Sequence, residues 1–324
     1  MNTSPQTQLT AQSDSYAAET SQTVIFGRQD YFSILLRLIG MELYKIRRRP
    51  MSKGLGIIAV VAVILLFLVV LFVTLLVVQR GASLSPSPLL PPLALYLVNQ
   101  AVLILGQVLI VILLGAMVGG EYGVGTVRLM LTRGPTRAQF LLAKAGAALI
   151  CCAIGAVVMI VLGILLGLFF NLFTGLPYNF DFFTAAWFGH ALLYLLITIA
   201  SLFVYSMLAL FLATLGRSTA AGIAGALTWL LLGENILHTI LVLIGAAAGG
   251  AAGDFLRAIP DYFIGSNTGA LQQNQNQYLR FFGATSLSDP SSISDLHAVL
   301  VLLAYLLIFI GLSLWLQQKR DITN

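Results

Sequence analysis

The stretch LGIIAVVAVILLFLVVLFVTLLVV, residues 55–78, decides the fold class, because no residue in it carries a charge. A run of about 20 apolar residues is long enough to cross a bilayer as an α-helix. Such a segment must be helical, since lipid cannot satisfy an open backbone. The composition agrees: 59% of the 324 residues are hydrophobic, 9% are charged, and the mean hydropathy is +0.94. A large soluble helical protein would need charged residues on the outer faces of its helices, and the apolar runs of this chain lack them.

Comparable apolar runs recur along the chain, and together they predict six membrane spans. The fold class that we expect is therefore all-α: a polytopic membrane protein with six transmembrane helices. The expected spans cover about residues 55–78, 93–118, 145–170, 186–215, 219–244 and 298–316. The long segment 245–297 between the last two spans is expected to hold a short re-entrant or interfacial helix and a surface loop. Its run of glycines and alanines would allow close helix packing.

Residues 29–50 predict an N-terminal amphipathic helix that lies in the membrane interface. Glu42 interrupts its apolar face and could pair with Lys45 three residues later, and Pro50 ends the helix. The preceding residues 1–28 are polar and predict a disordered cytoplasmic tail. The expected apolar face consists of Leu35, Leu38, Ile39 and Ile46.

The distribution of lysine and arginine predicts the orientation in the membrane. If the N-terminus is inside, 14 of the 17 cations lie on the cytoplasmic side, as the positive-inside rule requires. We therefore expect both termini in the cytoplasm and the plasma (inner) membrane as the location. The net charge of +5 then reflects topology, and no nucleic-acid partner is expected.

The chain lacks the motifs of several enzyme classes. It contains no GxxxxGK[ST] phosphate-binding loop, no HExxH and no GxSxG. Cys151 and Cys152 are adjacent, and we interpret them as small apolar packing residues. We therefore expect neither an enzyme nor a metal site.

Glu234, in the fifth expected span, has His238 four residues later on the same helical face. Charges inside spans usually face a bundle interior or a water-filled cavity. Two interpretations stay open. Glu234 and His238 could line a translocation path, or Glu234 could make a structural hydrogen bond to a neighbouring helix.

A charged insertion, EYGVGTVRLMLTRGPTRAQF at residues 121–140, separates the second and third spans. Gly119-Gly120 is expected to loosen the end of the second span, and Glu121 to mark its exit. Gly125-Thr126 can cap a short helix over about 127–132, and Arg133-Gly134-Pro135 breaks it. Thr136 followed by Gln139 forms a capping box that starts the next helix. These helix caps and helix breaks predict a short helix held rigidly between two spans.

These residues make the chain resemble the permeases of type-2 ATP-binding-cassette (ABC) transporters, over about residues 30–322. The motif is E-x3-GT-x-R-x2-L-x3-P-x-R-x2-F-x3-K. Its residues are Glu121, Gly125, Thr126, Arg128, Leu131, Pro135, Arg137, Phe140 and Lys144. The tail of about 25 residues departs from the usual family pattern.

The resemblance implies that residues 29–324 form an ABC permease transmembrane domain, most similar to those of exporters. The short helix would be a coupling helix that contacts a separate ATPase subunit, with Glu42 and Lys45 on the interfacial helix beside it. It implies two permease copies, in a homo- or heterodimer, and two ATPases. ATP and Mg²⁺ would bind to the partner ATPase, and this chain would bind no cofactor.

Two other classes of function remain as alternatives. One is a stand-alone secondary transporter or channel, and the other is an ABC-like sensor or immunity scaffold. All three predict the same spans, and the sequence does not specify the substrate.

Overall fold

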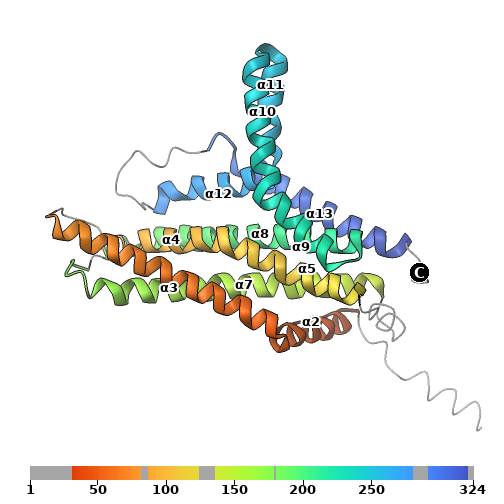
Figure 1. Cartoon of the computed structure of the whole chain (residues 1–324), viewed down its shortest axis with the longest axis horizontal. Helices are drawn as coiled ribbons and strands as arrows, with labels where there is room; N and C mark the ends of the chain where they lie inside the picture. The colour runs from red at the N-terminus through yellow and green to blue at the C-terminus, as the bar shows by residue number, and fades with distance from the viewer. Residues whose placement is uncertain (1–30, 82–86, 124–135, 179, 280–290, 320–324) are drawn as a thin grey trace, which may run out of the picture.

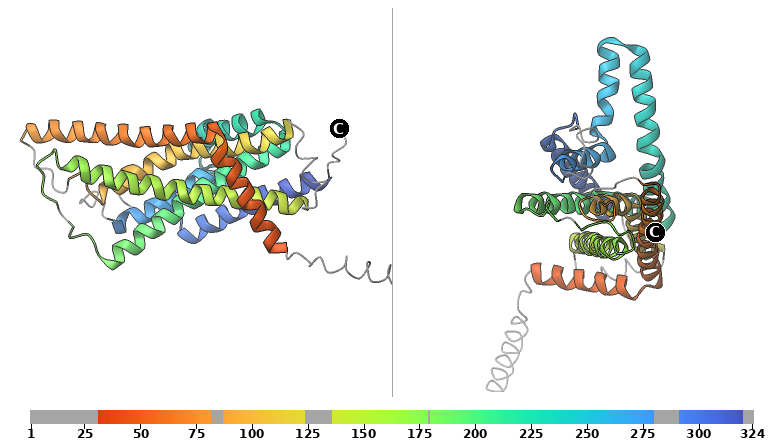
Figure 2. Two further views of the ribbon diagram at one scale, coloured as in Figure 1. Left: turned by 90° about the horizontal axis from the view of Figure 1, so that it is seen from below. Right: turned by 90° about the vertical axis from the view of Figure 1, so that its left-hand side faces the viewer.

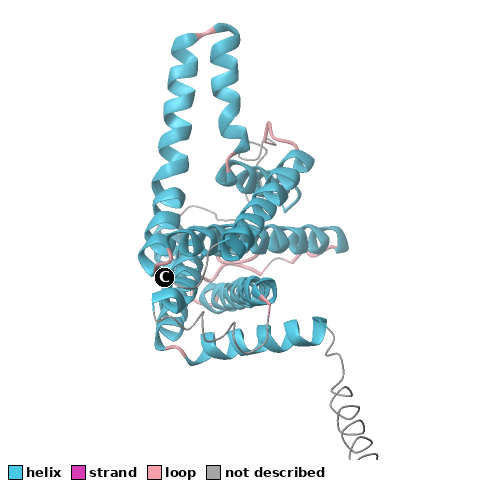
Figure 3. Cartoon of the chain, turned by 90° about the vertical axis from the view of Figure 1, so that its right-hand side faces the viewer, coloured by secondary structure: helices cyan, strands magenta, loops and turns pink. Residues whose placement is uncertain are grey.

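The computed structural model describes residues 31–81, 87–123, 136–178, 180–279 and 291–319. The described residues form helices joined by short turns and loops and contain no strand, as Figure 3 shows. The first half holds α2 (Tyr31–Arg48), α3 (Pro50–Gln79), α4 (Leu93–Ala101), the π-helix η1 (Val102–Gly106), α5 (Gln107–Gly123) and α7 (Arg137–Asn171). The second half holds α8 (Ala185–Gly216), α9 (Thr219–Thr228), the π-helix η2 (Trp229–Gly233), α10 (Glu234–Ala248), α11 (Gly250–Ala258), the 3₁₀-helix η3 (Ile259–Tyr262), α12 (Ile264–Leu279) and α13 (Asp295–Lys319).

Within the described ranges, six helical segments are long and apolar enough to cross a membrane, which confirms the predicted number and the predicted fold class. They are Pro50–Gln79, Leu93–Tyr122, Arg137–Asn171, Ala185–Gly216, Thr219–Ala248 and Asp295–Lys319. Each one overlaps a predicted span and extends beyond it at one or both ends. The chain is a multi-pass membrane protein.

The bundle is built around α8, which packs against α5, α7, α9, α12 and α13. The long helices α3, α5, α7 and α8 run along the longest axis of the molecule (Figure 1). Of the six candidate spans, α8 has the largest buried share, while the outer helices expose large apolar side chains such as Ile57 and Leu307. Such side chains suit contact with lipid.

The N-terminal helix α2 turns away from the direction of α3 and crosses the bundle, as the left view of Figure 2 shows. Leu38 and Ile46 are buried, and Leu35 and Ile39 are half-buried, so the predicted apolar face is confirmed. It packs on the first half of α7, where the Ile39 side chain lies over Gly146. The helix ends at Arg48, and Pro50 begins α3 at a first-turn position that tolerates proline.

The fifth segment bends where α9 passes through η2 into α10. While α9 packs on α5 and α8 inside the bundle, α10 leaves the bundle and pairs with α11. The two form a hairpin that stands across the direction of the long helices (Figure 1 and the right view of Figure 2). Its tip is Gly249-Gly250, where both glycines have positive φ. Gly245 and Gly253 face each other closely, so the expected close packing of the glycine–alanine run is confirmed.

The expectation that Gly119-Gly120 loosens the end of the second span is wrong, because α5 continues as a helix to Gly123. Gly119 instead lets α5 approach α9: a Cβ added there would clash with the backbone of Thr219. Gly115, one turn earlier, also lies close to α9, and a Cβ there would meet the Ile223 backbone nitrogen at 2.9 Å. This is the small-residue spacing that allows two membrane helices to pack backbone to backbone.

Candidate functional site

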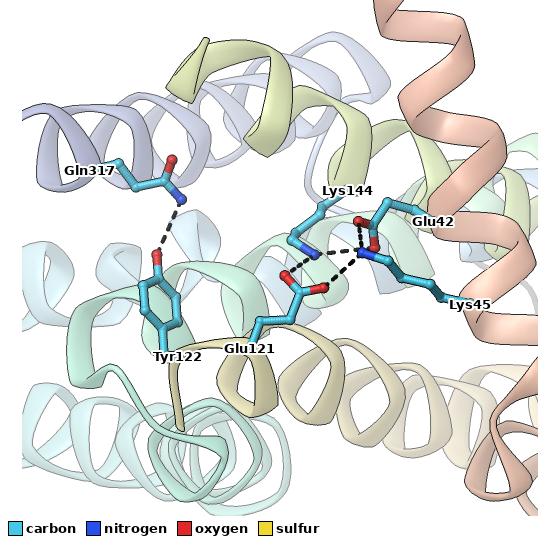
Figure 4. A network of polar contacts seen from close by, with 6 residues as sticks. All are labelled: Glu42, Lys45, Glu121, Tyr122, Lys144 and Gln317. Atoms are coloured by element: carbon cyan, nitrogen blue, oxygen red, sulfur yellow. Dashed lines mark hydrogen bonds and ion pairs between the residues drawn. The ribbon is translucent and has the colours of Figure 1, made fainter. Parts of the chain in front are cut away.

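Four charged side chains meet where α2, α5 and α7 come together, and we call them the ion cluster: Glu42, Lys45, Glu121 and Lys144 (Figure 4). Lys45 Nζ lies 2.7 Å from Glu42 Oε1 and 3.1 Å from Glu121 Oε1. Lys144 Nζ lies 3.2 Å from Glu42 Oε2 and 2.6 Å from Glu121 Oε2. Each lysine therefore contacts both glutamates, and the charges balance. The predicted pairing of Glu42 with Lys45 is confirmed, but it is only one of four contacts.

The ion cluster is buried most deeply at Lys144, whose side chain is 1% exposed, whereas that of Lys45 is 28% exposed. The Lys144 ammonium also lies 4.7 Å from the centre of the Phe140 ring, a favourable cation–π contact. A buried charge is costly unless it is paired and hydrogen-bonded. The contacts therefore fix α2 against the end of α5 and the start of α7.

Electrostatic coupling in the ion cluster shifts the pKa values of the two α2 residues. Burial raises the pKa of Glu42, but the ammonium groups of Lys144 and Lys45 outweigh burial and hold this pKa below its usual value of 4.5. Burial lowers the pKa of Lys45, but its hydrogen bond to Glu42 and the two carboxylates outweigh burial and raise this pKa above 10.5. Both side chains therefore stay charged throughout the physiological range.

A second group of contacts ties the start of α7 to the end of α13. The Arg137 guanidinium donates hydrogen bonds to the backbone carbonyls of Gln317, at 2.5 Å, and of Gln318, at 3.1 Å. The Gln317 side chain donates to the Tyr122 hydroxyl at 3.2 Å, as Figure 4 shows. Cations near a helix C-terminus also stabilise its exposed carbonyls. We call Tyr122, Arg137 and Gln317 the loop base, because Tyr122 precedes and Arg137 follows the segment 124–135 in the chain and both contact Gln317.

The capping box at the start of α7 is confirmed. The Thr136 side chain accepts a hydrogen bond from the Gln139 backbone at 3.2 Å, and the Gln139 side chain accepts one from the Thr136 backbone at 3.0 Å. In the chain, α5 therefore precedes the segment 124–135, and the capped first turn of α7 follows it.

The structure therefore brings together Glu42, Lys45 and Glu121 of the predicted site residues, and places Arg137, at the start of α7, against the end of α13. The predicted Gly125, Thr126, Arg128, Leu131 and Pro135 lie outside the described residues, as does the expected short helix over 127–132. The shared contacts of Lys144 and the role of Gln317 were missed from the sequence. Lys144 directly precedes the expected span 145–170 and lies inside α7 only because that helix begins at Arg137.

Glu234 forms a separate polar centre at the bend of the fifth segment. Its Oε1 accepts a hydrogen bond from Trp229 Nε1 at 2.8 Å. Its Oε2 accepts one from the Gly265 backbone N–H at 2.6 Å and one from the Tyr205 hydroxyl at 3.2 Å. Gly265 lies in the first turn of α12, where unpaired N–H groups favour an anion. Glu234 thus joins α8, η2 and α12, as the structural interpretation expects.

The sequence places Glu234 and His238 on one helical face, but the two side chains differ in their surroundings. Glu234 is buried, whereas His238 is exposed on α10. The other histidines have partners of their own: His190 contacts Gln275, and His297 contacts the Asp261 carbonyl. Across the described part of the chain, no three His, Cys, Asp or Glu side chains form a group that could hold a metal ion.

A stripe of hydroxyl-bearing side chains runs along α8, and the sequence analysis missed it. The four are buried and follow a 4-3-4 spacing that places them on one face: Tyr194, Thr198, Ser201 and Tyr205. Thr198 donates to Asn99 of α4, and Ser201 accepts a hydrogen bond from Gln107 of α5 at 2.8 Å. Tyr205 ends the stripe at Glu234. A polar seam therefore crosses the interior of an otherwise apolar bundle.

The ion cluster predicts how stability depends on pH. The lowered pKa of Glu42 gives stabilisation that is present above pH 4.5 and lost as the pH falls through the folded-state pKa. The raised pKa of Lys45 gives stabilisation that is present below pH 10.5 and lost at still higher pH. Thermal unfolding of the detergent-purified protein should therefore show a plateau between these limits. In a Glu42→Gln variant the plateau should be lower and the acid decline shallower; an unchanged acid decline would contradict the assignment.

The Glu234 centre predicts that even an isosteric amide is not tolerated there. All three partners are donors and they approach both carboxylate oxygens, so Glu234→Gln turns an N–H₂ group toward at least one donor. Leaving buried groups unpaired in this way costs about 1–3 kcal/mol. Thermal unfolding followed by tryptophan fluorescence should detect the loss, while His238→Gln on the exposed face should leave stability unchanged. Equal stability of the two variants would show that the Glu234 contacts are dispensable.

Comparison with known proteins gives one family. No curated protein matches the chain. A family model described as "Protein of unknown function (DUF2705)" matches residues 85–323, which include Glu121, Lys144 and Glu234 but not α2 or α3. The chain therefore belongs to the DUF2705 family of proteins of unknown function.

Proposed function

We propose that the chain is the membrane-spanning permease subunit of an ABC transporter and that it exports its substrate. A separate ATPase subunit would hydrolyse ATP with Mg²⁺, and two permease copies would form the complete membrane unit. In this proposal the protein resides in the plasma membrane with both termini in the cytoplasm. The chain itself performs no catalysis.

The observation that carries the proposal is the way in which the described residues on either side of 124–135 are anchored. Glu121, three residues before it, and Lys144, nine residues after it, are paired at 2.6 Å and are joined to α2. Arg137, two residues after it, is hydrogen-bonded to the end of α13. A push on this segment would therefore move α2, α5, α7 and α13 together. Such rigid linkage is what a transmission element between an ATPase and the spans requires.

The polar seam of α8 is the candidate translocation path in this proposal, with Glu234 at one end of it. The same seam also supports the alternative of a transporter that works alone, because a substrate path needs polar groups within the membrane. The two proposals differ in their need for ATP.

The test is ATP hydrolysis by a reconstituted complex. The full chain is co-expressed with a candidate P-loop ATPase, sought in the neighbouring reading frames, and placed in proteoliposomes. Arg128→Glu should reduce stimulated hydrolysis to the level of the ATPase alone, without changing the thermal stability of the chain. Arg80→Glu, at the far end of α3, is the matched control and should keep full stimulation.

Arg137→Glu is less suitable for this purpose, because the loss of its hydrogen bonds to α13 would disturb the loop base as well. Unchanged stimulation in Arg128→Glu would refute the coupling role. Substrate movement without any ATPase would favour the stand-alone transporter. ATPase binding without substrate movement would favour a sensor or immunity scaffold.

A further inference from the structure

An apolar groove lies between α3, the second segment and α7, and Ile46 of α2 and Leu202 of α8 complete its lining. Its volume is about 360 Å³, within the range of about 300–1,000 Å³ that is usual for small-molecule sites. Its rim includes Gly56 and Ile154, which are exposed on the outside of the bundle. The groove therefore opens toward the surface that faces lipid.

Small residues and a local change of helix type create this groove. Gly56 and Ala59 line it from α3, and Gly155 lines it from α7. A Cβ placed on Gly56 or Gly155 would meet no heavy atom within 4 Å, so the space in front of both is open. The π-helix η1 lines it from the second segment, and such wide turns recur at functional sites. An apolar groove that opens toward lipid suits an apolar chain better than water, because water would find few hydrogen-bond partners there.

One end of the groove is strongly basic. Ile46 and Ser52 line that end, and Arg49, the extended N-cap residue of α3, lies between them in the chain, three residues from each. Arg47 and Arg48 precede Arg49, Lys53 follows it, and no acidic residue occurs between Glu42 and Glu121. Among the described residues, no carboxylate forms an ion pair with any of these four cations.

We propose that this groove binds an anionic membrane phospholipid, with one acyl chain between α3, η1 and α7 and the phosphate at Arg49 and Lys53. The apolar walls favour a lipid chain, and the cations at one end favour a negative headgroup. A neutral lipid would leave the cations unused, and a soluble phosphate would leave the groove unfilled. This proposal is independent of ATP coupling.

The test measures lipid retention by the full chain, delipidated in mild detergent, with native mass spectrometry. Phosphatidylglycerol and phosphatidylcholine with identical acyl chains are added in equal amounts. Wild type should retain phosphatidylglycerol preferentially. Arg49→Gln and Lys53→Gln should each reduce this preference about fivefold, the value expected for one cation near a lipid surface. Arg80→Gln, at the other end of α3, should leave the preference unchanged.

The groove itself is tested by filling it. Gly155→Leu places a side chain in the open space and should reduce the retention of phosphatidylglycerol, whereas Gly311→Leu, at an equally open position on α13, should not. Gly56→Leu serves the same purpose if Gly155→Leu does not fold. Equal retention of the two lipids by wild type, or full retention by the groove-filling variant, would overturn the proposal. Competition by glycerol phosphate as strong as that by the lipid would also overturn it, in favour of a simple phosphate site.

Discussion

Replacing Lys144 with methionine is expected to be among the most destabilising single changes in this protein, at about 3–5 kcal/mol. The reason is the burial of the ion cluster. Methionine keeps the length and the apolar stem of lysine, but it leaves Glu42 with only Lys45 and removes the closest partner of Glu121. Both carboxylates are nearly inaccessible to water, so neither is solvated in place of its lost partner.

Two matched variants separate this effect from a general loss of charge. Lys45→Met removes an ammonium group from the same cluster, but its side chain is 28% exposed. Lys144 still pairs with both carboxylates, at 3.2 Å and 2.6 Å, and the exposed pair that is lost is worth less, so the cost should be nearer to about 1 kcal/mol. The double variant Glu121→Gln/Lys144→Met keeps the pair of Glu42 with Lys45 and restores neutrality, so it should recover part of the stability lost in Lys144→Met.

Thermal unfolding in detergent, followed by tryptophan fluorescence, measures all three variants at neutral pH. The expected order of stability is wild type, Lys45→Met, the double variant and Lys144→Met. If Lys144→Met were as stable as Lys45→Met, the buried cluster would not be what holds α2 on the bundle. The same experiment bears on the proposed function, because α2, α5 and α7 then lose their common anchor.

The spans could be predicted from the sequence because they depend on a property of each segment alone. An uncharged run such as residues 55–78 must be helical in lipid, whatever surrounds it. The start of α7 was equally predictable, since the hydrogen bonds of Thr136 and Gln139 join residues three positions apart. Local chemistry of this kind needs no knowledge of the tertiary fold.

The polar centres depend on which segments become neighbours, and the sequence does not carry that information in a local form. Lys144 is 102 positions from Glu42, and Gly265 is 31 positions from Glu234. The sequence pairs Glu234 with His238 by helical spacing alone. The bend at η2 instead turns the Glu234 side chain toward α8 and α12, while His238 stays on the exposed face of α10. Nothing in the span hydropathy signals this bend.

Gly119→Ala and Gly120→Ala are expected to change stability in opposite directions, although each adds one methyl group to neighbouring positions of α5. The Cβ added at position 119 would clash with the backbone of Thr219, whereas at position 120 no atom lies within 4 Å of it. Backbone atoms cannot rotate away, so α9 must move as a whole. We expect a cost of about 3 kcal/mol, the upper end of the usual range for overpacking.

At position 120 the same change should stabilise the protein by up to about 1 kcal/mol, because alanine is a better helix former than glycine. Thermal unfolding of the two variants tests the contrast directly. A loosened helix end, as expected from the sequence, would instead make both substitutions stabilising, since each would strengthen a frayed turn. Destabilisation confined to Gly119→Ala would establish that this glycine pair serves helix packing, and that α5 and α9 are locked together at the base of the segment 124–135.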